Sequence, residues 1–373
     1  MLQNVIQVSH SKVEALFPRF WETKLSFFLW GTFGIGKSFI IREACKRVAM
    51  AMSLKFSEDL ADAADDTFVF SVVNLHQFDA AEFKGLPVPD YDKKITTFFT
   101  TGALPTKGYG FIFFDEVNLA PPLVQASSYS LSLDRKLGDY RLPDGWMVAM
   151  AGNTFADRAH VQEMALPLKN RLAHLELKTP DVKGWTEGFA YANNINPIII
   201  NFLLFKEDCL HNYDPEDQEE VTVVATPRTW ALASKLIEGV ESPSLIADLM
   251  ATYVGSTIAK QVEAFAESML TVKIHDCFTT GVLPYDKVAF KQKPDITYAF
   301  IGSICSYYNK NMTEAYTKTV IDWLPLFSDE HATVLANQLA QITKANTKGF
   351  YAMVRTLDAK YLKAVTKYLA TMI

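Results

Sequence analysis

The sequence predicts an α/β fold in which helices cover a parallel β-sheet, followed by an all-helical region. Three observations support this class. Short apolar runs recur through the first half of the chain, and each ends in polar residues. Amphipathic helical patterns separate these runs, and the strand signal fades after about residue 180. Apolar strands without alternation are typical of a parallel sheet that is buried on both faces.

The first element in this order is a short helix over residues 12–23, which we expect Pro18 to interrupt. The apolar run 25–30 then has the length of a strand. Residues 39–52 follow as an amphipathic helix, because apolar side chains recur there at intervals of four. Strand, loop and helix therefore follow one another in the order that a phosphate-binding loop requires.

The loop between this strand and this helix fits the pattern G-x-x-x-x-G-K-[ST]. Its eight residues are Gly31, Thr32, Phe33, Gly34, Ile35, Gly36, Lys37 and Ser38. A glycine-rich loop of this kind can surround phosphate oxygens with backbone N–H groups, and the following helix N-terminus attracts the same charge. The alternative interpretation is a simple glycine-rich turn, which the flanking strand and helix do not favour.

Further strand-like runs are predicted at 67–74, 110–118 and 146–153, after an acidic stretch at 57–66 that we expect to be solvated. In the run 110–118 four bulky apolar residues are followed by Asp115 and Glu116, and the run 146–153 ends in Asn153. Because the carboxyl ends of parallel strands meet at one edge of a sheet, these polar residues should lie near the glycine loop.

These residue types match the needs of phosphoryl transfer, which are charge neutralisation and positioning. Lys37 would contact the β- and γ-phosphates of a nucleotide, and Ser38 with Asp115 would bind Mg²⁺. Glu116 would act as the general base that orients the attacking water. A solvated Asp-Glu turn is the alternative, and the preceding strand and loop favour the catalytic interpretation.

Composition sets further limits. A chain of 373 residues with 49% hydrophobic and 21% charged residues indicates two or three globular domains and excludes wholesale disorder. The net charge of −6 does not favour nucleic acid as a partner, although it is compatible with a local basic pore. Four scattered cysteines without a C-x-x-C pair, and no apolar run of membrane length, predict a cytoplasmic protein without a membrane anchor.

Four motifs occur in an order that resembles AAA+ ATPases: GTFGIGKS, FIFFDEVN, AMAGN and LPLKNR. More narrowly, QFDAAEFKGLPVPD, LSLDRKLGDYRLPDGW and ATPRTW resemble the MoxR branch, which is related to the AAA modules of dynein and midasin. The resemblance covers residues 25–240. It implies a five-stranded parallel sheet in an α/β core at 1–180 and a helical lid at 181–260. Beyond the resemblance, the helical pattern that continues from residue 255 onward predicts a helical extension at 261–373.

The resemblance also implies roles for three more residues. Asn153 matches sensor 1, which bonds the γ-phosphate or the water, and Arg171 matches the arginine finger that a neighbouring subunit supplies. Leu172 replaces the phenylalanine that is commoner after this arginine, so Arg158 remains a rival for that role. Arg228 matches sensor 2, which acts either on its own nucleotide or on that of a neighbour.

Two insertions are expected in this branch, a hairpin within residues 84–108 and a second hairpin at 134–145. Phe98, Phe99 or Tyr140 on these hairpins would either contact a remodelled partner or simply pack the hairpins, and the sequence leaves both open.

The resulting expectation is a homo-oligomeric ring, hexameric by analogy, that hydrolyses ATP with Mg²⁺ and remodels or activates a partner protein. A von Willebrand factor A domain protein is the partner class that the resemblance suggests. The alternatives are a nucleotide-gated assembly scaffold with slow hydrolysis and a DNA-acting motor, which the acidic balance disfavours.

Overall fold

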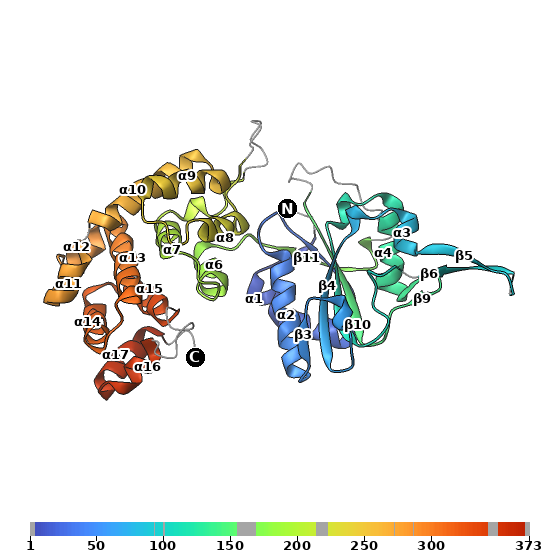
Figure 1. Ribbon diagram of the computed structural model, residues 1–373, viewed down its shortest axis with the longest axis horizontal. Coiled ribbons are helices and arrows are strands. Elements are labelled where there is room, and N and C mark those ends of the chain that lie inside the picture. The colour runs from blue at the N-terminus through green and yellow to red at the C-terminus, as the bar shows by residue number, and fades with distance from the viewer. Residues whose placement is uncertain are drawn as a thin grey trace. The chain divides into compact units, whose positions relative to one another are not determined.

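The computed structural model describes residues 4–92, 94–99, 101–154, 169–213, 223–271, 273–285, 287–341 and 350–369. The described residues up to Pro180 form one compact unit, and those from Asp181 onward form a second. The first contains the sheets and the second contains only helices (Figure 1).

A seven-stranded sheet forms the first unit, and every pair of neighbouring strands in it is parallel. The predicted fold class, an α/β unit with a parallel sheet that is followed by helices, is thereby confirmed. The expected number of five strands is wrong. Across the sheet the order is β1 (Ile6–Val8), β11 (Ala173–Leu177), β2 (Phe27–Trp30), β10 (Trp146–Gly152), β7 (Tyr109–Asp115), β4 (Thr67–Asn74) and β3 (Lys55–Ser57).

The two additional strands, β1 and β3, lie at the edges of the sheet and have three residues each. Neither carries an apolar run, because an edge strand has neighbours on one side only and is partly exposed. Their formation depends on pairing with β11 and β4, which the local sequence does not encode.

Alternation along the buried strands divides the apolar residues into two cores. In β7, Phe111 and Phe113 face one layer of helices, while Ile112 and Phe114 face the other. Helices α1 (His10–Thr23) and α2 (Lys37–Ala51) pack on the first face, and α3 (Ala80–Lys84) with α4 (Pro122–Asp134) pack on the second. The sheet is therefore covered on both faces, as the continuous apolar runs predict.

Pro18 lies inside α1, and the expected interruption of this helix is wrong. A proline in a helix interior costs about 3 kcal/mol or more. Val13 and Phe17 are buried against the sheet, and burial of each such side chain contributes about 1.5–3 kcal/mol. Ser9 also caps the helix, since its side chain accepts from the Lys12 N–H. Packing and capping together outweigh the effect of the proline.

Two hairpins extend from this unit. Strands β5 (Leu86–Asp90) and β6 (Ile95–Phe99) pair antiparallel, and so do β8 (Lys136–Leu137) and β9 (Tyr140–Arg141). The Tyr140 hydroxyl donates to the Pro105 carbonyl at 2.6 Å, so this side chain packs the inserted segments together. Phe98 is 40% exposed, whereas the side chain of Phe99 lies outside the described part of the structure.

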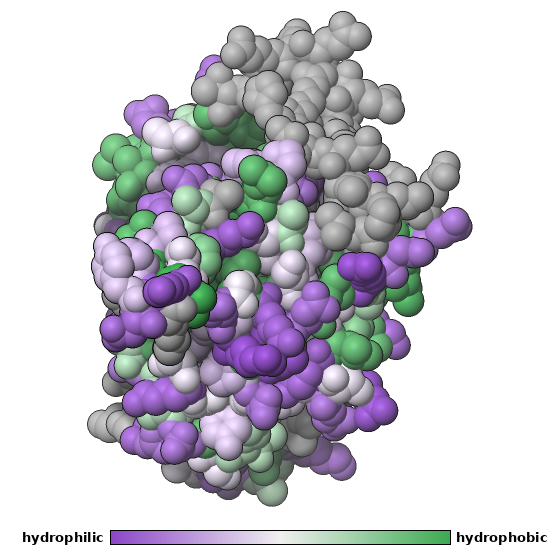
Figure 2. Space-filling model, turned by 90° about the vertical axis from the view of Figure 1, so that its right-hand side faces the viewer, coloured by the Kyte–Doolittle hydropathy of each residue, from purple (hydrophilic) through white to green (hydrophobic). Residues whose placement is uncertain are grey.

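Figure 2 views the molecule from the end at which Figure 1 shows β5 and β6. Hydrophilic side chains dominate this face, with apolar side chains scattered among them. On the first hairpin the exposed large apolar residues are Leu86, Tyr91, Ile95 and Phe98. These side chains remain available for contact with another molecule, which is the role that the sequence leaves open for Phe98.

The second unit consists of helices around a single hydrophobic core. The helices are α6 (Val182–Trp185), α7 (Pro197–Phe205), α8 (Pro227–Leu236), α9 (Pro243–Val254), α10 (Ser256–Thr271), α11 (Ile274–Thr280), α12 (Lys287–Gln292), α13 (Pro294–Lys310), α14 (Glu314–Trp323), α15 (Asp329–Gln341), α16 (Phe350–Thr356) and α17 (Ala359–Leu369). A π-helical segment, Thr186–Ala190, follows α6. Throughout the described ranges, no helix has both the length and the apolar character needed to cross a membrane.

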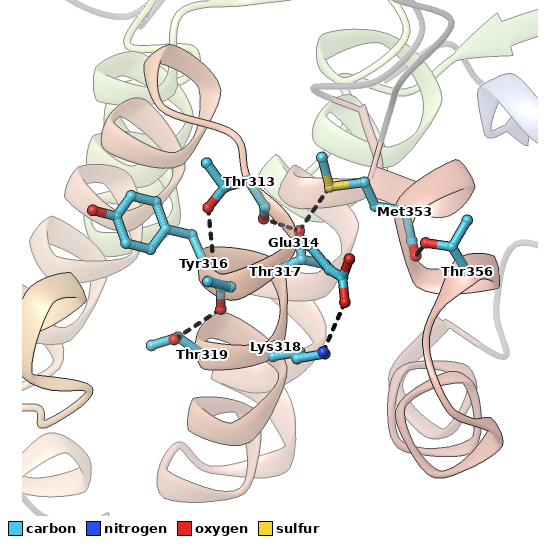
Figure 3. A network of polar contacts seen from close by, with 9 residues as sticks. Thr313, Glu314, Tyr316, Thr317, Lys318, Thr319, Met353 and Thr356 are labelled. Atoms are coloured by element: carbon cyan, nitrogen blue, oxygen red, sulfur yellow. Dashed lines mark hydrogen bonds and ion pairs between the residues drawn. The ribbon is translucent and has the colours of Figure 1, made fainter.

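Buried polar contacts join helices that are distant in sequence within this unit. The side-chain amides of Asn201 in α7 and Gln338 in α15 bond each other reciprocally at 3.1 and 3.0 Å. Figure 3 shows Thr317 of α14 directed toward Met353 of α16, beside the Glu314–Lys318 ion pair. One core therefore includes both the expected lid, 181–260, and the expected extension, 261–373, whose separation stays a prediction.

Gly110 provides a test of the packing between strands. A Cβ at this position would lie 2.3 Å from the Val69 carbonyl oxygen and 2.6 Å from the Trp146 ring. We expect Gly110→Ala to lower the free energy of unfolding by about 3 kcal/mol or more, measured by urea denaturation. Gly102→Ala is the control, because a Cβ there meets nothing within 4 Å, and its effect should stay within about 0.5 kcal/mol. Equal stability of the two variants would contradict this packing.

Candidate functional site

The glycine loop connects β2 to α2 at the carboxyl end of the sheet. Gly34 and Gly36 adopt φ angles of 73° and 95°, which side chains with a Cβ rarely adopt. Gly36 is the N-cap residue of α2 and provides no side-chain cap, so the first N–H groups of a 15-residue helix are directed toward the loop. Ile35 is buried in the core and anchors the loop. This arrangement is suited to bind a phosphate group.

Lys37 is buried, with 8% of its surface exposed. Its ammonium group donates to the carbonyl oxygens of Gly31 at 2.8 Å and Thr32 at 2.9 Å, and to Asn153 Oδ1 at 3.0 Å. These three bonds fix the direction of the ammonium group. Lys37 therefore joins the loop to the end of β10.

Ser38 and Asp115 are also brought together. The Ser38 hydroxyl donates to Asp115 Oδ2 at 2.6 Å, which links the first turn of α2 to the end of β7. A hydroxyl and a carboxylate at this spacing fit Mg²⁺, which takes one or two protein ligands and completes its shell with water and phosphate oxygens. Within the ranges that the structure describes, no group of three His, Cys, Asp or Glu residues could hold a metal on its own.

Glu116 follows Asp115 with a φ angle of 53°, and its N–H donates to Asp115 Oδ1 at 2.9 Å. Its carboxylate lies elsewhere in the site, because Oε2 is 3.0 Å from Nδ1 of His76. His76 was not among the predicted site residues. Its signal was weak, a lone histidine two residues after the strand 67–74, at the edge where strand ends carry polar groups.

Asn153 lies at the end of β10, beside Lys37, as predicted for a residue at the carboxyl edge of the sheet. Its main chain is bonded by Asn118, a second residue that the sequence analysis did not single out. Asn118 stands two residues after Glu116 and is 1% exposed. The site therefore draws its polar groups from the ends of β2, β4, β7 and β10.

Arg171 does not belong to this cluster. It is exposed in the turn before β11, and Ala173 at the start of β11 pairs with Phe27 at the start of β2. Gly31 follows Phe27 by four residue steps along β2, which corresponds to roughly 13 Å at 3.3 Å per residue. The turn that carries Arg171 thus lies at the amino ends of the strands, whereas the glycine loop lies at their carboxyl ends.

A histidine holds this turn in place. Trp30 Nε1–H donates to His174 Nδ1 at 2.9 Å, and His174 Nε2 lies 2.6 Å from the Lys169 carbonyl oxygen. A carbonyl only accepts, so the His174 proton is on Nε2. These bonds tie the turn that carries Arg171 to the strand that carries the glycine loop.

The two remaining arginines have different positions. Arg228 is the second residue of α8 in the helical unit and is exposed, and its role as sensor 2 stays a prediction. Arg158 lies outside the described residues.

His10 in α1 contacts the glycine loop. Its Nε2 is 2.8 Å from the Ile35 carbonyl oxygen, so this nitrogen carries the proton and donates it. Burial lowers the pKa of His10, although the Ile35 carbonyl and the Glu14 carboxylate oppose this effect. Burial therefore favours the neutral ring in the folded protein.

A polar cavity of about 270 Å³ opens beside the loop. It is lined by Gln7, Gly31, Thr32, Thr154, Glu176, Leu177, Lys178 and Thr179. A larger cavity of about 370 Å³ lies at the amino ends of the strands, near Trp21, Lys24 and Tyr109, and is not part of the site. The cavity beside the loop offers space for a group attached to a bound phosphate.

No protein-family model matches this sequence, and neither does any curated protein. Solved structures do match it. A mutant of RuvB from Thermotoga maritima is 13% identical over 76% of this chain and 81% of its own, with a TM-score of 0.37. A candidate ATPase from Cytophaga hutchinsonii is 15% identical over 76% and 80%, with a TM-score of 0.34. NtrX from Brucella abortus in complex with ADP is 13% identical over 95% and 68%, with a TM-score of 0.33. At these values the likeness assigns no activity to this chain.

The His10 contact predicts how stability depends on pH. Because its pKa is lowered in the folded protein, the unfolded chain binds more protons below about pH 6.5. Stability contributed by neutral His10 should therefore be complete above about pH 6.5 and fall as the pH decreases toward the folded pKa. We expect urea unfolding of His10→Asn to show a smaller loss of stability than the wild type between about pH 7 and pH 5.5.

His331 in α15 also has a pKa lowered by burial, so His331→Asn is the matched variant for the helical unit. If His10→Asn retained the full pH dependence of the wild type, the role given to the neutral His10 ring would be wrong.

Proposed function

We propose that this protein hydrolyses ATP with Mg²⁺ and that a neighbouring copy completes its active site. The observation that carries this proposal is the convergence of two contacts at the carboxyl edge of the sheet: Lys37 with Asn153, and Ser38 with Asp115. A buried ammonium, the N–H groups at a helix N-terminus and a hydroxyl–carboxylate pair are the groups that a triphosphate and its metal require.

Each group has a defined part in this mechanism. Ser38 and Asp115 would hold Mg²⁺, which supplies neutralisation of phosphate charge when it is bound. Lys37 contacts the β- and γ-phosphates, and the N–H groups of the loop surround their oxygens. The nucleoside occupies the cavity beside Gly31 and Thr32.

Glu116 accepts the proton of the attacking water as general base. For this step its carboxylate leaves His76 and turns toward the loop, because the contact with His76 Nδ1 occupies Oε2. The side-chain amide of Asn153, which contacts Lys37, orients the water or the γ-phosphate.

Arg171 is assigned to the site of a neighbouring copy. Arg171 is exposed, and it lies at the amino ends of the strands, away from its own glycine loop at the carboxyl ends. Both features support action in trans. We therefore propose a ring-forming, MoxR-like assembly, hexameric by analogy, that remodels or activates a partner protein. A von Willebrand factor A domain protein is the partner class we propose on the motif resemblance alone.

A second candidate function is a nucleotide-gated scaffold with slow hydrolysis. The contact between His76 and Glu116 favours it, because a general base whose carboxylate is held by a neighbouring side chain is not available to the water. Steady-state turnover with and without a candidate partner protein separates the two functions, since a scaffold should hydrolyse slowly in both conditions.

The roles of Lys37 and Glu116 predict different defects. Lys37→Ala should abolish detectable ATP binding, whereas Glu116→Gln should retain ATP binding and lower kcat by about 100-fold or more. Fluorescent nucleotide titration and phosphate release measure the two quantities. Glu22→Gln is the control, because Glu22 is an exposed residue of α1. Wild-type turnover by Glu116→Gln would contradict its role as the base.

Action of Arg171 in trans predicts complementation. Lys37→Ala and Arg171→Ala should each be inactive alone, and mixing them should restore part of the activity. An Arg171→Ala subunit then binds ATP and receives Arg171 from a Lys37→Ala neighbour. Phosphate release across a series of mixing ratios measures this effect, with Arg19→Ala in place of Arg171→Ala as an exposed-arginine control. A mixture without activity would argue against a shared site.

A further inference from the structure

The side chain of Asn118 makes a paired contact with the main chain of Asn153. Its Nδ2 donates to the Asn153 carbonyl oxygen at 2.7 Å, and the Asn153 N–H donates to Oδ1 at 3.2 Å. One side-chain amide thus satisfies both polar main-chain groups of a residue at which β10 has ended. Asn118 is 1% exposed and Asn153 is 8% exposed, so water does not replace these bonds.

The neighbouring glycine makes this contact possible. A Cβ on Gly152 would lie 2.5 Å from Asn118 Oδ1 and 2.9 Å from the Phe28 ring. Only a residue without a side chain allows the Asn118 amide to approach the end of β10 this closely. Gly152 and Asn118 therefore act as a pair that fixes the path of the chain at Asn153.

Asn118 belongs to the same short turn as the proposed metal ligand and base. The 3₁₀ turn Val117–Leu119 begins directly after Glu116, whose left-handed conformation allows the Asp115 carboxylate to accept its N–H. The Asn118 amide then connects this turn to the adjacent strand β10. The turn that follows β7 and the residue that follows β10 are thereby held as one unit.

The contact continues from Asn153 to the glycine loop, because Asn153 Oδ1 accepts from Lys37 at 3.0 Å. With its main chain held on both sides, Asn153 can redirect its amide only by rotating its side chain. The contact with Asn118 therefore fixes the position from which the Asn153 side chain can contact a phosphate bound to Lys37.

We propose that Asn118 is a positioning residue for phosphoryl transfer, which acts through Asn153 and keeps that amide in register with Lys37 and with the turn of Asp115 and Glu116. This inference rests on the proposed function. A positioning error should appear in the chemical step more than in ground-state binding, because the water and γ-phosphate are aligned only during the reaction.

The test is a double-mutant cycle of Asn118→Ala and Asn153→Ala, with kcat, ADP affinity and thermal unfolding measured for each protein. We expect Asn118→Ala to lower kcat by about 10- to 100-fold and to change ADP affinity by less than about 3-fold. Because Asn118 acts through Asn153, the double variant should be no slower than Asn153→Ala by more than about 2-fold.

Two further variants separate positioning from simple loss of a buried amide. Asn118→Asp keeps the acceptor for the Asn153 N–H but places a carboxylate oxygen against the Asn153 carbonyl oxygen, so its kcat should fall at least as far as that of Asn118→Ala. Asn201→Ala removes a fully buried amide from the helical unit; its melting temperature should fall while its kcat below that temperature stays at the wild-type value.

The outcomes are distinguishable. If the wild type hydrolyses ATP and the two losses in kcat multiply, or if Asn118→Ala lowers only the melting temperature, the positioning role is wrong and the proposed function stands. If the wild type does not hydrolyse ATP, the proposed function fails and this inference fails with it.

Discussion

The bonds of the Lys37 ammonium to Gly31, Thr32 and Asn153 are the interaction on which the rest of the site depends. They require that the carbonyl groups of Gly31 and Thr32 face the Lys37 ammonium. They also require that the neighbouring strand β10 ends beside the glycine loop. Both conditions follow from the parallel pairing of β2 with β10, in which Gly152 lies beside Trp30. The glycine loop alone could bind a phosphate, whereas the pairing of β2 with β10 adds the side chain of Asn153 beside that phosphate site.

Much of the fold could be predicted because its strands are unusually apolar. The run that became β7 places alternate residues in two cores, and only a sheet covered on both faces buries such a run completely. The edge strands β1 and β3 could not be predicted, since three partly polar residues form a strand only when a neighbour provides the hydrogen bonds. Pro18 misled the prediction of α1, because tertiary packing of Val13 and Phe17 outweighs a local preference.

The site shows the same division between local and tertiary information. Lys37, Ser38, Asp115 and Asn153 were predictable, because each lies in a short pattern at the end of a strand, and the structure brings them together. His76 and Asn118 were not, since their importance lies in contacts with Glu116 and Asn153 that no spacing in the sequence reveals. Arg171 lies away from its own loop, so its proposed role depends on a second copy of the chain.

Calorimetric titration of the purified protein with ATP shows whether Lys37, Ser38, Asp115 and Asn153 form one site for ATP and its metal. We expect saturable binding that is tighter with Mg²⁺ than with a chelator, because Ser38 and Asp115 provide oxygen ligands beside the phosphate loop. Absence of saturable binding at millimolar ATP, with and without Mg²⁺, would contradict it.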